Sequence, residues 1–257
     1  ANGDVCVYTS AQANLIWDQT VESNTPQTHA AVRLLDTRPV AVVTDARGRV
    51  TANGQGTTVA WDARDRITST TQSGATTGFT YDANGNPTSA TTAGTRTDYV
   101  WQQTGDLPRL LTETRGGVAA NYVYGPMGAE MAGNATSGFA TLSTDLMGSV
   151  TAYTTASGAT TRTWTYAPYG QRSTWAANGA DTPVMGLGYT GELQTGDLLH
   201  LRARTLDTAS GRFLSIDPAW AGTYTAYAYA KGVPVLLGDP SGLATRDLCL
   251  AGAVAVG

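Results

Sequence analysis

Short runs of β-branched and aromatic residues alternate with turn-forming residues along most of this chain. The runs at residues 67–71 and 78–81 are typical, because each is rich in β-prone side chains and is too short for a stable helix. No window carries the i, i+3, i+4, i+7 apolar spacing of an amphipathic helix. Residues 1–243 are therefore predicted to be strand and turn, whereas residues 248–257 lack turn signals and indicate the start of a different element.

One turn pattern recurs at a nearly constant spacing. Residues 43–50, 60–67 and 80–87 each place an Asp after an apolar or aromatic run, and these Asp residues follow one another at intervals of 17 and 20. A degenerate fourth copy covers residues 99–107. Asp opens a turn by accepting hydrogen bonds from backbone amides ahead of it, and the Gly that follows tolerates a positive φ. The repeats therefore predict an antiparallel ribbon of hairpins, which must curl or close because an open stack leaves unpaired edges.

The composition argues against several classes of function. Only 14% of the 257 residues are charged and the formal net charge is −4, with no Lys/Arg-rich run, so we expect no nucleic-acid partner. The two cysteines, Cys6 and Cys249, lack metal-binding spacing, and His29 and His200 are the only histidines. We therefore expect no metal and no cofactor. No long apolar run predicts a membrane span in this fragment.

Residues 43 to 243 resemble the RHS/YD-repeat family, found in polymorphic toxins and in the C component of Tc toxins. The aromatic-Asp-x-x-Gly units resemble YD repeats, and the sequence from Gly188-Tyr189-Thr190-Gly191-Glu192 to Ile216-Asp217-Pro218 resembles the RHS repeat-associated core. The final box of that core corresponds to Asp239-Pro240-Ser241-Gly242-Leu243. The chain departs from the family pattern at residues 205–208 and at Val233-Pro234.

This resemblance implies an all-β fold in which YD-repeat hairpins spiral into a hollow shell, or cocoon, closed by the associated core around a C-terminal toxin. It implies a YD-repeat segment at residues 1–110, an associated core with an autoprotease at 111–243, and the truncated start of the toxin at 244–257. The family cuts the chain after the Leu of its last box, which corresponds to the bond between Leu243 and Ala244. The implied protein is bacterial and secreted or on the cell surface, and its partners are its own toxin segment and other toxin-complex or secretion-system components.

Two carboxylates, Asp217 and Asp239, are the candidate catalytic groups, and each precedes a proline that fixes a local turn. Peptide hydrolysis without a metal, a catalytic Ser or a catalytic Cys needs an acid and a base near the scissile carbonyl. Two Asp side chains close enough to share one proton supply both. Asp-Pro steps also mark ordinary turns, and the resemblance is what favours catalysis here.

Arg204 matches the functional arginine of the family. Its guanidinium can polarise the scissile carbonyl or hold a carboxylate ionised, or it can simply form a structural pair with a carboxylate such as Asp207. Arg202 is expected on the same strand face, two residues earlier.

Two functions therefore compete at this stage. One is the C-terminal part of a toxin shell that releases its cargo by a single aspartyl-type self-cleavage after Leu243. The alternative is a non-catalytic YD-repeat surface protein for adhesion or carbohydrate binding, in which tryptophans such as Trp61 and Trp101 contact sugars.

The first of these functions makes a prediction about the strands. If the strands form a shell that encloses a polypeptide, we expect small or polar side chains on both of their faces.

Overall fold

The computed structural model describes residues 42–105, 107–126, 128–176, 185–218, 226–243 and 246–247. These residues form antiparallel strands and turns, and their helical elements are the 3-10 turns η1 (Tyr189–Gly191) and η3 (Tyr229–Gly232). The predicted all-β fold is thus confirmed. Within the same residues, no helix has the length and hydropathy of a membrane span.

The largest sheet contains fourteen strands that pair in chain order, so each strand lies between its predecessor and its successor. Such a meander follows directly from a run of hairpins. The strands are β1 (Val43–Thr44), β2 (Val50–Ala52), β3 (Thr57–Trp61), β4 (Ile67–Gln72), β5 (Ala75–Tyr81), β6 (Pro87–Thr92), β7 (Thr95–Gln102), β8 (Arg109–Arg115), β9 (Val118–Gly125), β10 (Gly128–Asn134), β11 (Gly138–Thr144), β12 (Val150–Thr154), β13 (Thr160–Tyr166) and β14 (Arg172–Ala176).

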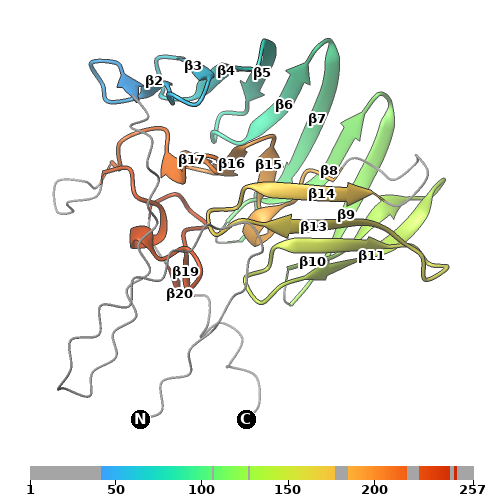
Figure 1. The fold of residues 1–257 in the computed structure, drawn as a ribbon. Helices are drawn as coiled ribbons and strands as arrows, with labels where there is room; N and C mark the ends of the chain where they lie inside the picture. Colours follow the sequence, from blue (N-terminus) through green and yellow to red (C-terminus); the bar gives the residue numbers. More distant parts are fainter. Residues whose placement is uncertain are drawn as a thin grey trace, which may run out of the picture.

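Two smaller sheets follow. The first has four strands, β15 (Leu193–Thr195), β16 (Leu198–Leu201), β17 (Arg204–Asp207) and β18 (Arg212–Phe213). The second pairs β19 (Leu237–Gly238) with β20 (Arg246–Asp247). In Figure 1 the large sheet curves from β2–β5 through β6–β9 to β13–β14, and strands β15–β17 lie on its concave side.

The predicted Asp turns form in the repeats. Asp62 Oδ1 accepts hydrogen bonds from the backbone amides of Arg64 and Arg66 at 2.8 and 3.0 Å. Asp82 Oδ1 accepts the equivalent bonds from the residues two and four positions ahead, both at 2.9 Å. Arg66 Nη1 also donates to the Asp82 carbonyl of the next turn at 3.2 Å, so adjacent repeats are tied together along the edge of the sheet. The sequence predicted this local structure correctly.

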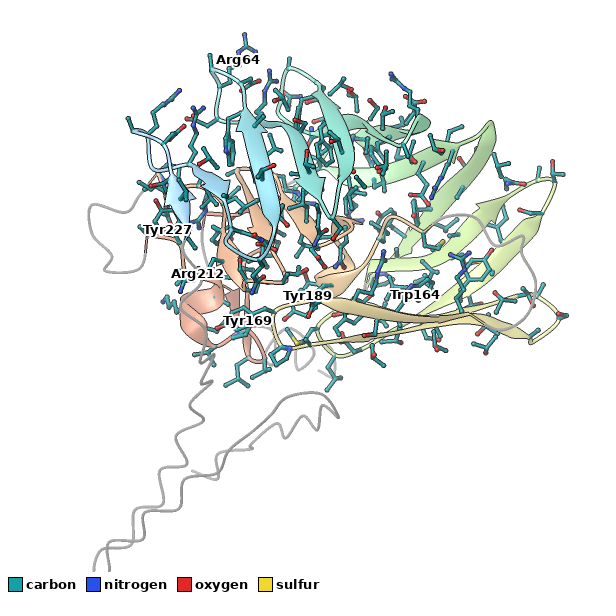
Figure 2. The ribbon with its side chains drawn as sticks, turned by 45° about the horizontal axis from the view of Figure 1, so that its top comes forward. Arg64, Trp164, Tyr169, Tyr189, Arg212 and Tyr227 are labelled. Carbon is teal, nitrogen blue, oxygen red and sulfur yellow. The ribbon has the colours of Figure 1, made fainter. Side chains whose placement is uncertain are left out.

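One hydrophobic core joins the large sheet to the smaller one. Phe79 and Leu110 of the large sheet are buried with Leu199 and Phe213 of the four-stranded sheet. Figure 2 labels Tyr189 of η1. The centroid of its ring lies 5.8 Å from that of Tyr166 of β13. The prediction of small or polar side chains on both strand faces is therefore wrong for the concave face, because the four-stranded sheet packs there and needs an apolar surface.

The large sheet continues across the boundary proposed at residue 110, because β8 spans residues 109–115 and pairs with β7 and β9. The division into residues 1–110, 111–243 and 244–257 remains a prediction. Residues 1–41 and 248–257 lie outside the described residues.

Candidate active site

The fold brings together all three predicted catalytic residues. Arg204 opens β17, Asp217 follows β18, and Asp239 follows β19. Arg204 Nη2 lies 3.1 Å from Asp217 Oδ2 and 3.3 Å from Asp239 Oδ2. A single nitrogen thus contacts two carboxylates that are 22 residues apart in the sequence.

Arg204 is held in a largely dry environment. Its side chain is 3% exposed, and its guanidinium carbon lies 3.6 Å from the centroid of the Phe213 ring, at cation–π distance. Burial lowers the pKa of Arg204, and the charges of Asp217 and Asp239 oppose that shift. An arginine in this setting stays a guanidinium, so it presents a fixed positive charge and a fork of N–H donors.

The same guanidinium reaches the backbone of the final box. Arg204 Nε donates a hydrogen bond to the carbonyl oxygen of Gly242. That oxygen belongs to the residue immediately before Leu243, the predicted site of cleavage. Arg204 therefore connects the carboxylates to the peptide segment in which the family resemblance implies cleavage.

Asp239 organises the box through its other oxygen. Asp239 Oδ1 accepts hydrogen bonds from the Leu243 amide at 3.0 Å and from the Ser241 hydroxyl at 3.1 Å. Gly242 has a left-handed φ of +73°, and a Cβ there would lie 2.4 Å from the Leu201 carbonyl oxygen. The box is thus a tight turn whose Gly is required both by its backbone conformation and by lack of space.

The position of Arg202 differs from the prediction. Residues 202 and 203 form the two-residue turn between β16 and β17, so Arg202 is not on a strand face with Arg204. Arg202 pairs with Glu192 and donates to the carbonyls of Pro240 and Pro108 at 2.8 and 2.6 Å.

Asp207 is not the partner of Arg204 in the contacts described. Its Oδ2 accepts hydrogen bonds from Asn53 Nδ2 and from Ser210 Oγ, each at 2.8 Å. The alternative of a purely structural Arg204–Asp207 pair is therefore wrong, because Asp207 serves to tie β17 to the turn after β2.

Leu243 is 48% exposed, and Ala244 lies outside the described residues. A cavity of about 370 Å³ lies beside Arg204, with Trp61, Tyr81 and Pro218 in its wall. Ser215, which follows β18, also lines this cavity. The described residues contain no cluster of three His, Cys, Asp or Glu side chains suited to a metal ion.

The tryptophans that had suggested sugar binding have structural partners where they are described. Trp61 Nε1 donates to the carbonyl of Val50 at 2.8 Å, and Trp101 Nε1 donates to that of Pro87 at 2.6 Å. Each indole therefore ties the end of one strand to its neighbour. His200 is a buried strand residue in contact with the Phe79 ring.

Sequence reasoning missed Glu192 as a member of this neighbourhood. It lies just after η1, is 8% exposed, and pairs with Arg202. Burial raises its pKa, while Arg202 opposes that rise. The available signal was its place in the Gly188–Glu192 motif, since an acidic residue among small and aromatic ones needs a partner when it is buried.

Comparison with known proteins concerns the repeat and the fold. A family model described as the RHS repeat matches residues 61–97. This segment is therefore similar to an RHS repeat. It contains the Asp62 and Asp82 turns. The sequence matches no curated protein.

Solved structures share the fold at low identity. The crystal structure of TcdB2-TccC3-Cdc42 matches with a TM-score of 0.58 and 17% identity, covering 76% of this chain and 10% of that chain. The crystal structure of TcdB2-TccC3 matches with a TM-score of 0.58 and 19% identity, covering 76% and 11%. A Photorhabdus luminescens Tc holotoxin pore with mutated TccC3 matches with a TM-score of 0.54 and 17% identity, covering 83% and 11%.

The chain spans about one tenth of the length of these Tc toxin structures. At such identities the likeness concerns the fold. The RHS repeat and the Tc toxin neighbours together place the fold of this chain among RHS shell-type structures.

Proposed function

We propose that this chain is the C-terminal part of an RHS toxin shell and that it hydrolyses its own backbone once, between Leu243 and Ala244. The observation that carries the proposal is the set of contacts made by Arg204. Its guanidinium binds Asp217, Asp239 and the carbonyl of Gly242 at the same time. These contacts join two carboxylates to the residue before the proposed cleavage site.

The exposure of the two carboxylates suggests their roles. The side chain of Asp217 is 14% exposed and that of Asp239 is 2% exposed. We assign Asp217 as the base that takes a proton from water, whose oxygen attacks the carbonyl carbon of Leu243. As the bond from Leu243 to Ala244 breaks, the proton taken from water passes from Asp217 through Asp239 to the leaving nitrogen, and the products are a carboxylic acid and an amine.

Arg204 has one further donor for this reaction. Its Nη1 is buried and has no hydrogen-bond partner among the described residues. We assign this N–H to the oxygen that becomes negative on Leu243 as water adds. A donor held rigidly in a dry site stabilises such charge far better than water does.

The encapsulation half of the proposal is supported by the RHS repeat, by the Tc toxin neighbours and by the curvature of the large sheet (Figure 1). The enclosed cargo is the chain's own segment from residue 244 onward. Toxin-complex components are the proposed partners, by analogy with the TcdB2-TccC3 complexes, and secretion is the proposed route.

Mass spectrometry tests the cleavage. The chain is produced with a C-terminal tag and weighed at intervals from the first hour. We expect the mass of the intact chain to be replaced by a product ending at Leu243 and a tagged peptide beginning at Ala244. A chain that stays intact over days, with the fold verified by circular dichroism, contradicts self-cleavage and leaves the non-catalytic surface protein.

A further inference from the structure

Three consecutive carbonyl groups of the final box accept hydrogen bonds from three consecutive residues of the β16–β17 hairpin. This arrangement fixes the register of the box along the hairpin, because a slip by one residue would break all three bonds. The carbonyl group of Leu243, at the predicted cleavage site, follows these three carbonyls directly in the chain. The bonds run from Arg202 Nη1 to Pro240 O at 2.8 Å, from Ala203 N to Ser241 O at 3.1 Å, and from Arg204 Nε to Gly242 O.

Arg202 is itself anchored from two other directions. Its Nη1 pairs with Glu192, which is buried just after η1, and its Nη2 donates to the carbonyl of Pro108 at 2.6 Å. Pro108 directly precedes β8 of the large sheet. Arg202 therefore connects the large sheet and the Glu192 loop to the box at Pro240.

The backbone of Arg202 is strained. Its φ is +56°, at the first position of the two-residue turn between β16 and β17. Glycine is favoured at a turn position of this kind, because a side chain in the left-handed region costs about 1–2 kcal/mol. An arginine that occupies such a position must make contacts that offset the strain, and here they are the contacts with Glu192, Pro108 and Pro240.

We propose that Arg202 and Glu192 form a clamp that positions the box 239–243 for the self-cleavage proposed above. Arg202 is a positioning residue, because it touches the box at Pro240 and not the scissile bond. Glu192 holds the guanidinium of Arg202 in place. This inference rests on the proposed function, and it gives Arg202 a role distinct from that of Arg204.

Arg202→Gly separates a positioning role from a structural one. Glycine suits the left-handed turn, so the hairpin itself is not strained by the change. The double variant Arg202→Gly with Glu192→Gln also removes the buried carboxylate that would otherwise be left unpaired. We expect the double variant to stay folded but to cleave about tenfold to a hundredfold more slowly, because small misplacements of reacting groups have effects of that size.

Two further variants complete this experiment. Arg202→Lys keeps one positive charge but has a single donor group, so it should restore part of the rate, with the product still ending at Leu243. Arg96→Ala removes an exposed arginine from its pair with Asp98 on β7 and serves as the matched control that cleaves at the parental rate. Parental cleavage by the Arg202→Gly double variant overturns the clamp, whereas an intact parent chain contradicts the proposed function instead.

Hydrogen exchange tests the clamp independently of cleavage. In a background of Asp217→Asn, which leaves the box attached to the rest of the chain, the amides of Ala203 and Leu243 report on the box through their hydrogen bonds. We expect the Arg202→Gly double variant to speed exchange at both amides by about tenfold or more, while β3–β5 stay protected. Unchanged exchange at both amides overturns the clamp, whether or not the parent chain cuts itself.

Discussion

Arg204 donates a hydrogen bond from Nε to the carbonyl oxygen of Gly242, and it is Gly242 that allows this contact. Any larger residue would direct a Cβ at the Leu201 carbonyl and at the Arg204 amide, at 2.4 and 2.8 Å. The position of the final box thus depends on Gly242, which has no side chain and so leaves room for the backbone of the hairpin and for the long side chain of Arg204. The geometry of the site is set as much by the backbone as by the carboxylates.

Gly242→Ala is therefore expected to displace the box from Arg204. Overpacking against backbone atoms and a left-handed φ of +73° together should cost about 2–4 kcal/mol locally. We expect cleavage after Leu243 to slow at least tenfold in a mass-spectrometric time course. Gly74→Ala is the matched control, because Gly74 has a φ of +81° with nothing within 4 Å of an added Cβ. Slow cleavage in the control, or normal cleavage in Gly242→Ala, contradicts the expectation.

The Asp turns and the meander were predictable from the sequence because they are local. An Asp that binds the amides two and four residues ahead needs nothing from the rest of the chain, and a run of such turns produces antiparallel neighbours. The pairing of Arg204 with both Asp217 and Asp239 came from family resemblance, and spacing alone would not have given it. The contact depends on β17, β18 and β19 meeting in three dimensions.

The clamp and the filled concave face were not predictable from residue patterns. Arg202 was expected on a strand, because a two-residue turn with an arginine at positive φ contradicts ordinary turn preferences. The apolar concave face was missed because alternation within one strand cannot show what lies opposite it. Phe79 and Leu110 are buried there with residues of the four-stranded sheet, which lie far along the chain.

The two carboxylates should be separately essential to cleavage. Asp217→Asn and Asp239→Asn keep the size of the side chain but cannot exchange the proton, so each should slow cleavage by about 10²–10⁴-fold. Arg204→Lys keeps the charge but cannot bind both carboxylates and Gly242 at once, and we expect it to fail as well. The measurement is the mass of freshly prepared protein followed over days, since a single turnover can finish slowly.

Asp207→Asn is the control for these variants. Asp207 is 2% exposed and accepts hydrogen bonds from Asn53 and Ser210, away from Arg204. The variant should lower the melting temperature, because an amide group then faces the amide of Asn53, yet it should cleave after Leu243 at the parental rate. Rapid cleavage in both catalytic Asn variants would eliminate the carboxylate mechanism and direct attention to Ser241.

Glu113 should make the fold less stable in alkali. It is buried in β8 beside Tyr122, and burial raises the pKa of its carboxyl to about 8 from an ordinary value of 4.5. The folded state therefore binds a proton that the unfolded state releases, and stability falls as the pH rises from about 4.5 through 8.

Glu113→Gln cannot ionise and should lose less stability over the same range. Urea unfolding at pH 5 and pH 9 should show a smaller drop for the variant by a few kcal/mol. Glu130→Gln, at an exposed position on β10, is the matched control and should follow the parent. Equal drops for the parent and Glu113→Gln would show that the buried carboxyl is ionised in both states.

His200 should have the opposite effect, in acid. It is 5% exposed in β16, against the ring of Phe79, and burial lowers its pKa to about 4 from an ordinary 6.5. The unfolded state binds a proton there before the folded state does, so stability is lost as the pH falls from about 6.5 through 4.

His200→Phe carries no titratable group and fits an aromatic neighbourhood. The difference between parent and variant in unfolding free energy should be flat above pH 7 and should grow by about 3 kcal/mol toward pH 4, which urea titrations at half-unit steps can resolve. Carboxylates that titrate in the same range act on both proteins and cancel in that difference. A difference that stays constant from pH 7 to pH 4 would mean that His200 takes up its proton as readily in the folded state as in the unfolded state.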